Sequence, residues 1–300
     1  MTIPSYPEFV PLSLEHKETI DSLLAGAPPS ISEHTFTNMF MWRQHYGYKI
    51  SGFEDGVLLL VEPEDEEPFF MAPMGFADPY NAVATCLDFL KERGSARGVS
   101  RIEQAVAEKF LQKDETLILE PDRDNFDYVY LVDDLINLSG RKYHRKKNHL
   151  NKFLKSFNFE YRSLTKDLLE DCFQLIEEWC ILRNCEESPS LAGEAQAIQE
   201  ALNNMNALSF KGGALMVDGR LEAFSLGEPL NRNTVVIHIE KANGDIQGIY
   251  AAINQQFLEH EWSGFELVNR EQDLGEEGLR KAKESYLPDH YVEKCTVRRT

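Results

Sequence analysis

A β-branched strand that leads through a glycine loop into a helix is the feature that most constrains the fold of this chain. Residues 234–239 predict the strand and residues 249–261 the helix, with another strand at 265–268. Gly244 and Gly248 lie in the loop between the first strand and the helix. A helix that begins after such a loop presents backbone N–H groups to an anionic or acyl ligand. The two glycines are therefore either ligand-binding positions or an ordinary loop and helix start.

The rest of the pattern predicts a similar order of elements in both halves, which favours an α+β protein of two domains. The second half predicts a strand at 157–164, two helices, a hairpin at Asp218 and Gly219, and, after the strands above, a helix near 278–286 and a strand near 291–297. The first half predicts helices near 14–24, 35–46 and 80–93, with strands on both sides of 54–56. The halves share no sequence repeat, so a single α+β fold without duplication is the alternative.

Charge is unevenly distributed along the chain. The formal net charge is −19, yet residues 141–155 carry seven basic and no acidic side chains. An acidic surface disfavours general nucleic-acid binding, because phosphates are repelled from most of it. The basic segment predicts either a solvated connecting helix or a local contact for phosphates, tRNA included. The candidate phosphate-binding residues are Arg141, Lys142, Arg145, Lys146, Lys147 and Asn148.

Composition and terminal sequence predict a cytoplasmic protein without a membrane span. No apolar run approaches the ~20 residues that a membrane helix needs, and the first residues lack the pattern of a signal peptide. The five cysteines are scattered and form no Cys-x-x-Cys pair, so reduced thiols and no metal site are expected.

Three stretches carry a resemblance to a known family. They are residues 139–153, the Glu240–Lys241 pair with the two residues after it, and residues 269–283 with Pro288. In these the chain resembles a bacterial family related to the C-terminal domain of lysyl-phosphatidylglycerol synthases. That domain is similar to the Fem-type transferases, which use aminoacyl-tRNA and have tandem domains of the acyl-CoA N-acyltransferase (GNAT) fold.

The resemblance implies two GNAT-like domains, each a mixed, mostly antiparallel sheet flanked by helices. We expect an N-terminal domain at residues 1–138, a basic connecting helix at 139–155 and a C-terminal domain at 156–300. In acetyltransferases of this superfamily, the loop after the central strand holds the CoA pyrophosphate. Here Asp245 opens that loop and Tyr250 stands where a small residue is usual. Both changes oppose pyrophosphate binding, by charge and by bulk.

Three charged residues near the central strand are candidate catalytic groups. Lys241 ends the strand and could bind a substrate carboxylate or phosphate, or stabilise an oxyanion; alternatively it is solvated or paired with Glu240. Glu228 and Glu240 are candidate general bases for an attacking amine, or ordinary surface carboxylates. His238 lies between two isoleucines and is interpreted as a core or rim histidine.

The stretch at 269–283 supplies further candidates for ligand binding. Asn269 and Asp273, close to glycines, suggest a tight loop fastened by side-chain hydrogen bonds, so Asp273 has either a structural or a binding role. Arg280 and Lys283 share a helical face that could receive a phosphate or carboxylate. A surface ion pair of Arg280 with Glu284 is the alternative. The candidate ligand-binding residues are Gly244, Gly248, Tyr250, Asn269, Asp273, Arg280 and Lys283.

The leading hypothesis is a transferase that moves an aminoacyl group from charged tRNA to an amine or hydroxyl of a small molecule or peptide. In that reaction the acceptor attacks the ester directly, so no protein nucleophile is needed. The first alternative is an acetyl-CoA-dependent N-acetyltransferase. The second is a binding module for a metabolite or protein that performs no chemistry.

Overall fold

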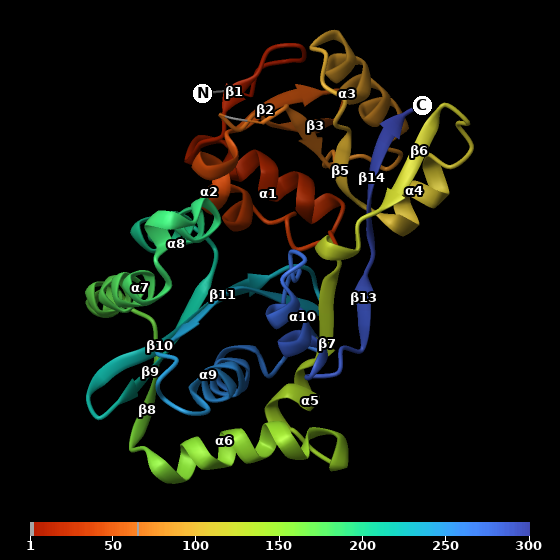
Figure 1. Cartoon of the computed structure of the whole chain (residues 1–300). Helices are drawn as coiled ribbons and strands as arrows, with labels where there is room; N and C mark the ends of the chain where they lie inside the picture. Colours follow the sequence, from red (N-terminus) through yellow and green to blue (C-terminus); the bar gives the residue numbers. More distant parts are fainter. Residues whose placement is uncertain (1–2, 65) are drawn as a thin grey trace. The chain divides into compact units, whose positions relative to one another are not determined.

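The computed structural model describes residues 3–64 and 66–300, and the chain forms two compact units (Figure 1). The first unit comprises the chain up to Asp127 together with Gln272–Glu277 and Tyr291–Thr300, and the second comprises Tyr128–Glu271 and Gly278–His290. The expected boundaries differ from these units, because the final ten residues join the first unit and the basic helix is part of the second. Sheet pairing is the physical reason, as the strand orders below show.

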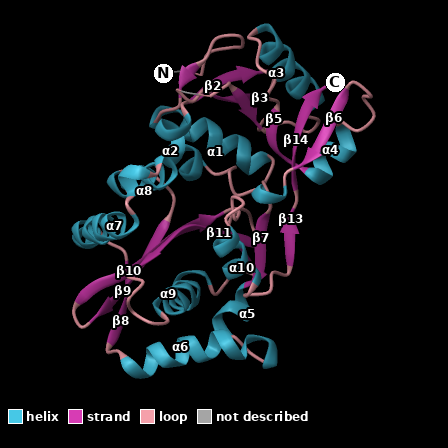
Figure 2. Cartoon of the chain, viewed as in Figure 1, coloured by secondary structure: helices cyan, strands magenta, loops and turns pink. Residues whose placement is uncertain are grey.

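The first unit contains a seven-stranded sheet in the order β1-β2-β3-β4-β5-β14-β6 (Figure 2). Its strands are β1 (Val10–Pro11), β2 (Tyr48–Phe53), β3 (Gly56–Val61), β4 (Phe69–Met71), β5 (Val99–Glu103), β6 (Leu117–Pro121) and β14 (Lys294–Arg299). Its helices include α1 (Lys17–Gly26), α2 (Phe36–Tyr46), α3 (Tyr80–Glu92) and α4 (Gln104–Phe110). The last strand of the chain thus completes the N-terminal sheet.

The second unit contains a seven-stranded sheet in the order β13-β7-β12-β11-β10-β9-β8. Its strands are β7 (Asp127–Leu131), β8 (Phe159–Ser163), β9 (Lys211–Val217), β10 (Arg220–Pro229), β11 (Thr234–Ala242), β12 (Leu267–Asn269) and β13 (His290–Val292). Its helices include α5 (Val132–Asn137), α6 (His144–Ser156), α7 (Leu169–Arg183), α8 (Pro189–Asn203), α9 (Ile249–Phe257) and α10 (Glu277–Glu284). Strand β7, which precedes the basic segment in the sequence, pairs with β12.

Both sheets are mixed and mostly antiparallel, as expected. In the first sheet β4 and β5 are parallel and α3 connects them; in the second sheet β11 and β12 are parallel and α9 connects them. A parallel pair requires such a crossover. The predicted hairpin is also confirmed, since Asp218 and Gly219 both have positive φ, the requirement of a type I′ turn. No described helix is long and apolar enough to span a bilayer.

A buried charge network ties the last strand into the first unit. Lys294 on β14 is fully buried, and its Nζ lies 2.6 Å from Glu33 Oε2 and 2.7 Å from Asp127 Oδ1. Ser32 donates its backbone N–H and its hydroxyl to Asp127, at 2.8 and 2.9 Å. Arg101 approaches the second oxygen of Glu33, with Nε–Oε1 at 3.1 Å. Each buried carboxylate therefore has a cation beside it.

We predict that Lys294→Met destabilises the protein by about 3–5 kcal/mol, because it leaves two carboxylates buried without their shared ammonium. Urea denaturation measures the change. Lys91→Met, at an exposed position on α3, is the matched control and should change stability by no more than about 0.5 kcal/mol. Equal effects of the two substitutions would contradict the prediction.

Candidate functional site

The candidate site lies in the second unit, where the pairing of β11 with β12 ends. The parallel register runs from Thr234 opposite Leu267 to Val236 opposite Asn269, and β12 stops there while β11 continues to Ala242. On the other side of β11, Leu226 pairs with Ile239 and Gly227 with Ile237, so His238 lies in a β-bulge. Bulges re-aim side chains and are common next to active sites.

His238 is held between two carboxylates. Its Nδ1 lies 2.8 Å from Glu271 Oε1 and its Nε2 lies 3.0 Å from Glu228 Oε1. Carboxylates only accept hydrogen bonds, so both ring nitrogens carry protons and the ring is an imidazolium. Burial alone lowers the pKa of His238, but hydrogen bonds and charge from Glu228 and Glu271 outweigh it and raise the pKa to about 9. His238 is therefore no base at neutral pH.

A second charged contact joins β11 to the segment after β12. Arg270 Nη2 lies 3.1 and 3.2 Å from the two carboxylate oxygens of Glu240. Asn254 on α9 also donates to Glu240, at 3.2 Å. The Arg270 guanidinium lies 5.0 Å from the ring centroid of Tyr286, and Lys146 Nζ lies 3.9 Å from the same centroid. Residues far apart in sequence thus gather around Glu240.

The backbone at Arg270 and Glu271 is fastened by two residues that were predicted to bind ligand. Asn269 Oδ1 accepts from Glu271 N at 2.8 Å, and Glu271 has a φ of 55°, a left-handed conformation that non-glycine residues adopt only where the surroundings support it. Lys283 Nζ donates to the carbonyl oxygens of Arg270 and Glu271, to the latter at 3.1 Å. In this structure Asn269 and Lys283 position neighbouring site residues.

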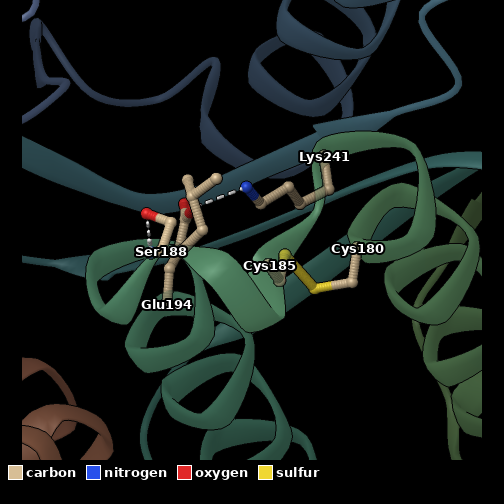
Figure 3. The surroundings of a disulfide bond; sticks show 6 residues. Cys180, Cys185, Ser188, Glu194 and Lys241 are labelled. Carbon is tan, nitrogen blue, oxygen red and sulfur yellow. Dashed lines mark hydrogen bonds and ion pairs between the residues drawn. A yellow bond between two sulfur atoms is a disulfide. The ribbon is translucent and has the colours of Figure 1, made fainter.

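Lys241 lies on the other face of the sheet from Glu240. Its Nζ lies 2.7 Å from Glu194 Oε2 on α8 (Figure 3). The same Nζ lies 3.4 Å from the ring centroid of Trp179 on α7. Burial lowers the pKa of Lys241, and Glu194 partly opposes that shift. Successive strand residues point to opposite faces. The structure therefore does not bring Lys241 and Glu240 together on one reacting group, whereas Glu228 lies beside His238.

The expectation of reduced thiols throughout is wrong. Cys180 near the end of α7 and Cys185 form a disulfide, drawn next to Lys241 and Glu194 in Figure 3. Asn184 ends α7 in the left-handed conformation and turns the chain back, so the Cα atoms of the two cysteines come within 5.0 Å. A reversal of this kind cannot be read from cysteine spacing alone.

The glycine loop at 244–248 is covered by protein at its second glycine. Gly248 precedes α9 with a φ of 89°, and a Cβ placed there would lie 2.5 Å from the carbonyl oxygen of His149 on α6. Gly244 is exposed and has no atom within 4 Å of such a Cβ. Tyr250 is partly exposed and donates its hydroxyl to the carbonyl of Ala242. Gly248 thus permits close approach of a helix backbone.

The basic segment forms α6 and the short turn before it, and its charges point in different directions. Lys142 pairs with Asp134 at 3.1 Å, and Lys147 donates to the carbonyl of Asn137 at 3.3 Å. Asn148 contacts His144, and Arg141 and Arg145 are exposed. Lys146 alone among the predicted phosphate-binding residues turns toward Tyr286 and Arg270. Lys142, Lys147 and Asn148 thus already have polar partners within the protein.

Two further predicted ligand residues lie elsewhere. Asp273 is fully buried in the first unit, where it accepts from Gly275 N at 2.9 Å and from Arg123 at 3.2 Å. That is the structural alternative stated for it. Arg280 lies on α10 and is partly exposed.

Sequence reasoning did not select Arg270, Glu271 or Tyr286, and it took His238 for a core or rim residue. Arg270 and Glu271 lie inside the stretch that carries the family resemblance, and that density of polar residues was the available signal. The bulge that turns His238 toward Glu228 has no signature in sequence. The position of Tyr286 beside Arg270 and Lys146 depends on how α10 packs, which the sequence does not show.

Residues 25–298 match the family described as phosphatidylglycerol lysyltransferase, C-terminal. The chain belongs to this family. A conserved protein of unknown function from Bacteroides thetaiotaomicron is 31% identical over the whole of both chains, with a TM-score of 0.90. An uncharacterized protein of Mycoplasmoides gallisepticum is 23% identical over 57% of this chain, a match that spans just over half, 55%, of that curated relative.

Solved structures of lower identity share the fold. L-PGS from Bacillus licheniformis has a TM-score of 0.66 at 13% identity, covering 100% of this chain and 94% of that one. FemX has a TM-score of 0.57 at 10% identity, covering 96% of each chain. The predicted class, two GNAT-like units of the α+β type, is confirmed.

We predict that the contribution of His238 to the stability of the protein falls as pH rises from about 6.5 to about 9. The pKa of His238 is about 9 in the folded chain and ~6.5 in an unfolded one. A raised folded-state pKa gives a contribution that is complete below the unfolded value and lost as pH rises through the folded value. Urea denaturation across pH 6 to 10 should show a smaller fall for His238→Asn. An unchanged pH profile would contradict the assignment, and His149→Asn, at an exposed position on α6, is the control.

We also predict that Gly248→Ala destabilises the protein by at least about 1–2 kcal/mol, because a Cβ is disfavoured in the left-handed region and would also meet α6. Gly244→Ala, which meets nothing, is the matched control and should change the unfolding free energy little. Equal unfolding free energies for the two variants would show that α6 does not close the loop.

Proposed function

We propose that the second unit transfers an aminoacyl group from charged tRNA to an amine or hydroxyl acceptor, with the reacting ester placed where β11 and β12 cease to pair. The observation that carries the proposal is the cluster of Glu228, Glu240 and Glu271 at that point, in a chain of this family. An aminoacyl ester has an α-ammonium next to its carbonyl, and carboxylates suit that charge. FemX and L-PGS support the proposal through their shared fold.

The reaction needs no nucleophile from the protein. The acceptor nitrogen or oxygen bonds to the carbonyl carbon, the bond from that carbon to the ribose oxygen breaks, and the acceptor's proton passes to a carboxylate and then to the ribose oxygen. Of the two carboxylates predicted as general bases, Glu240 is the proposed proton acceptor, because its side chain is 15% exposed, against 6% for Glu228. Most of the rate would come from holding the two substrates together.

Lys241 is proposed for a different role from the one its position in sequence suggested. It is paired with Glu194 on the other face of the sheet. There it would hold α8 against β11 and so support the strand that carries Glu240. Arg141 and Arg145, exposed on the basic segment, are the proposed contacts for the phosphates of tRNA.

Acetyl-CoA is the less favoured donor. The amides at a helix start can hold a pyrophosphate only where the backbone is approachable. The carbonyl of His149 occupies the space next to Gly248 that a pyrophosphate would need, and Asp245 adds a negative charge to the loop.

Direct binding tests the proposal. Aminoacyl-tRNA and acetyl-CoA are titrated separately into the purified full chain at two salt concentrations. We expect charged tRNA to bind, more weakly at high salt, and acetyl-CoA not to bind. Arg145→Glu should weaken tRNA binding and reduce the slope of log affinity against log salt by about one.

Arg232→Glu is the control for that substitution, because it reverses an exposed charge in the same unit outside the basic segment. An equal loss in both variants would mean that tRNA is attracted only by overall charge. Binding of acetyl-CoA alone would move the protein to the acetyltransferases, and binding of neither would favour a module without chemistry.

A further inference from the structure

Two neighbouring cations in the second unit, Arg270 and Lys146, have one carboxylate, Glu240, in ion-pair contact between them. Arg270 Nη1 is buried, and within residues 3–64 and 66–300 it has no hydrogen-bond partner. Both contacts of Arg270 with Glu240 are made by Nη2. Lys146 Nζ lies over Tyr286, next to Arg270, and in the same described residues has no carboxylate within ion-pair distance. Glu240 therefore offsets one of two positive charges.

Such an arrangement is costly unless something else completes it. A buried donor on a charged group loses its hydration and gains nothing in return. Lys146 could have remained in solvent, as Arg145 does on the same helix. Instead burial, with Arg270 adding to it, lowers the pKa of Lys146 to about 8. The local environment disfavours a second positive charge, and a bound anion would reverse that preference.

We propose that Lys146 and Arg270 form a subsite for a small oxyanion, a carboxylate or phosphate group of a substrate, over the ring of Tyr286. Guanidinium and ammonium groups form strong, charge-assisted hydrogen bonds with both kinds of anion. Lys146 has the long, flexible side chain and is only half-buried. It can move to admit the anion to Nη1 and then bind the anion from the other side.

The subsite adds a substrate class to the proposed function, and this part of the inference rests on that function. Glu240 contacts Arg270 directly. If Glu240 takes the proton of the acceptor, the anion bound at Arg270 belongs to the acceptor. The acceptor is then an amine or hydroxyl compound that carries a carboxylate or phosphate group.

The subsite is tested with sulfate and acetate as probes, which stand for phosphate and carboxylate groups. They are titrated into the full ¹⁵N-labelled chain against sodium chloride of equal ionic strength. The Nε–H signal of Arg270, identified by its loss in Arg270→Lys, reports binding in NMR spectra. We expect that signal to shift with saturation for at least one probe.

Variants of Lys146 separate a specific site from general attraction. Lys146→Gln should weaken anion binding roughly 10- to 100-fold, Lys146→Arg should restore it, and Lys152→Gln should leave it unchanged. Lys152 is an exposed cation on the same helix, so it is the matched control. No saturable shift in the wild type, or equal losses in the two glutamine variants, would overturn the subsite.

The pH dependence gives a second readout. The charged or titratable groups facing Lys146 are Arg145 on α6, Glu240 on β11, Arg270 after β12 and Tyr286 after α10. Burial raises the pKa of Tyr286 to about 12, so it stays neutral. Sulfate affinity should fall as pH rises through about 8 in the wild type and stay level in Lys146→Arg. A fall of equal size in Lys146→Arg would remove Lys146 from the subsite.

The source of the anion is distinguished with tRNA. If the acceptor supplies it, Lys146→Gln leaves tRNA affinity unchanged while Arg145→Glu lowers it. Equal weakening in both variants would assign the anion to the donor and overturn the statement about the acceptor. Sulfate and acetate binding requires no transfer, so a failed transfer or tRNA-binding assay would leave the subsite standing, and an absent subsite would leave the aminoacyl-transfer proposal standing.

Discussion

The early end of the parallel pairing between β11 and β12 is the constraint on which the second unit's site depends. Beyond Val236 and Asn269 the backbone groups of the two segments no longer bond to each other. Side chains make the connection instead, through His238 with Glu271 and Glu240 with Arg270. These contacts are charged, and a polar ligand could replace some of them. If the two strands were paired along their whole length, backbone hydrogen bonds would take the place of these side-chain contacts.

Strand alternation divides the charged residues of β11 between two environments. Lys241 faces α7 and α8, where Glu194 neutralises it, and Glu240 faces α9, where Arg270 and Asn254 hold it. Two adjacent residues of the strand thus lie in different surroundings: Lys241 is in an ion pair with Glu194, and Glu240 is in the cluster with Arg270. The bulge at His238 interrupts the simple alternation of side chains along β11. It places the charged ring of His238 near the point where β11 and β12 cease to pair. The position of a charge along this strand is therefore a poor guide to its role.

Local signals in the sequence were sufficient for most elements, and the long-range arrangement was beyond them. The β-branched run of β11 and the turn at Asp218 and Gly219 each report their own conformation. Whether β14 joins the first sheet depends on pairing with β5 and β6, about 175 to 200 residues earlier. The positive charge of Lys146 could be read from the sequence. The direction of its side chain could not, because Tyr286 lies beside it only in the folded second unit.

The first unit has the same parallel arrangement with a different chemistry. Past the paired ends of β4 and β5 lies a cavity of about 160 Å³, lined mainly by apolar residues with His34 and Glu103 among them. Burial lowers the pKa of His34 to about 4, although its hydrogen bond to the carbonyl of Ala72 opposes the shift, so this ring is neutral. His238 has carboxylates on both sides and is charged. Because one topology carries a neutral histidine in an apolar cavity and a charged one among carboxylates, the side chains beyond the parallel pair, rather than the fold, decide the chemistry of each unit. The proposed charge-dependent transfer therefore belongs to the second unit alone.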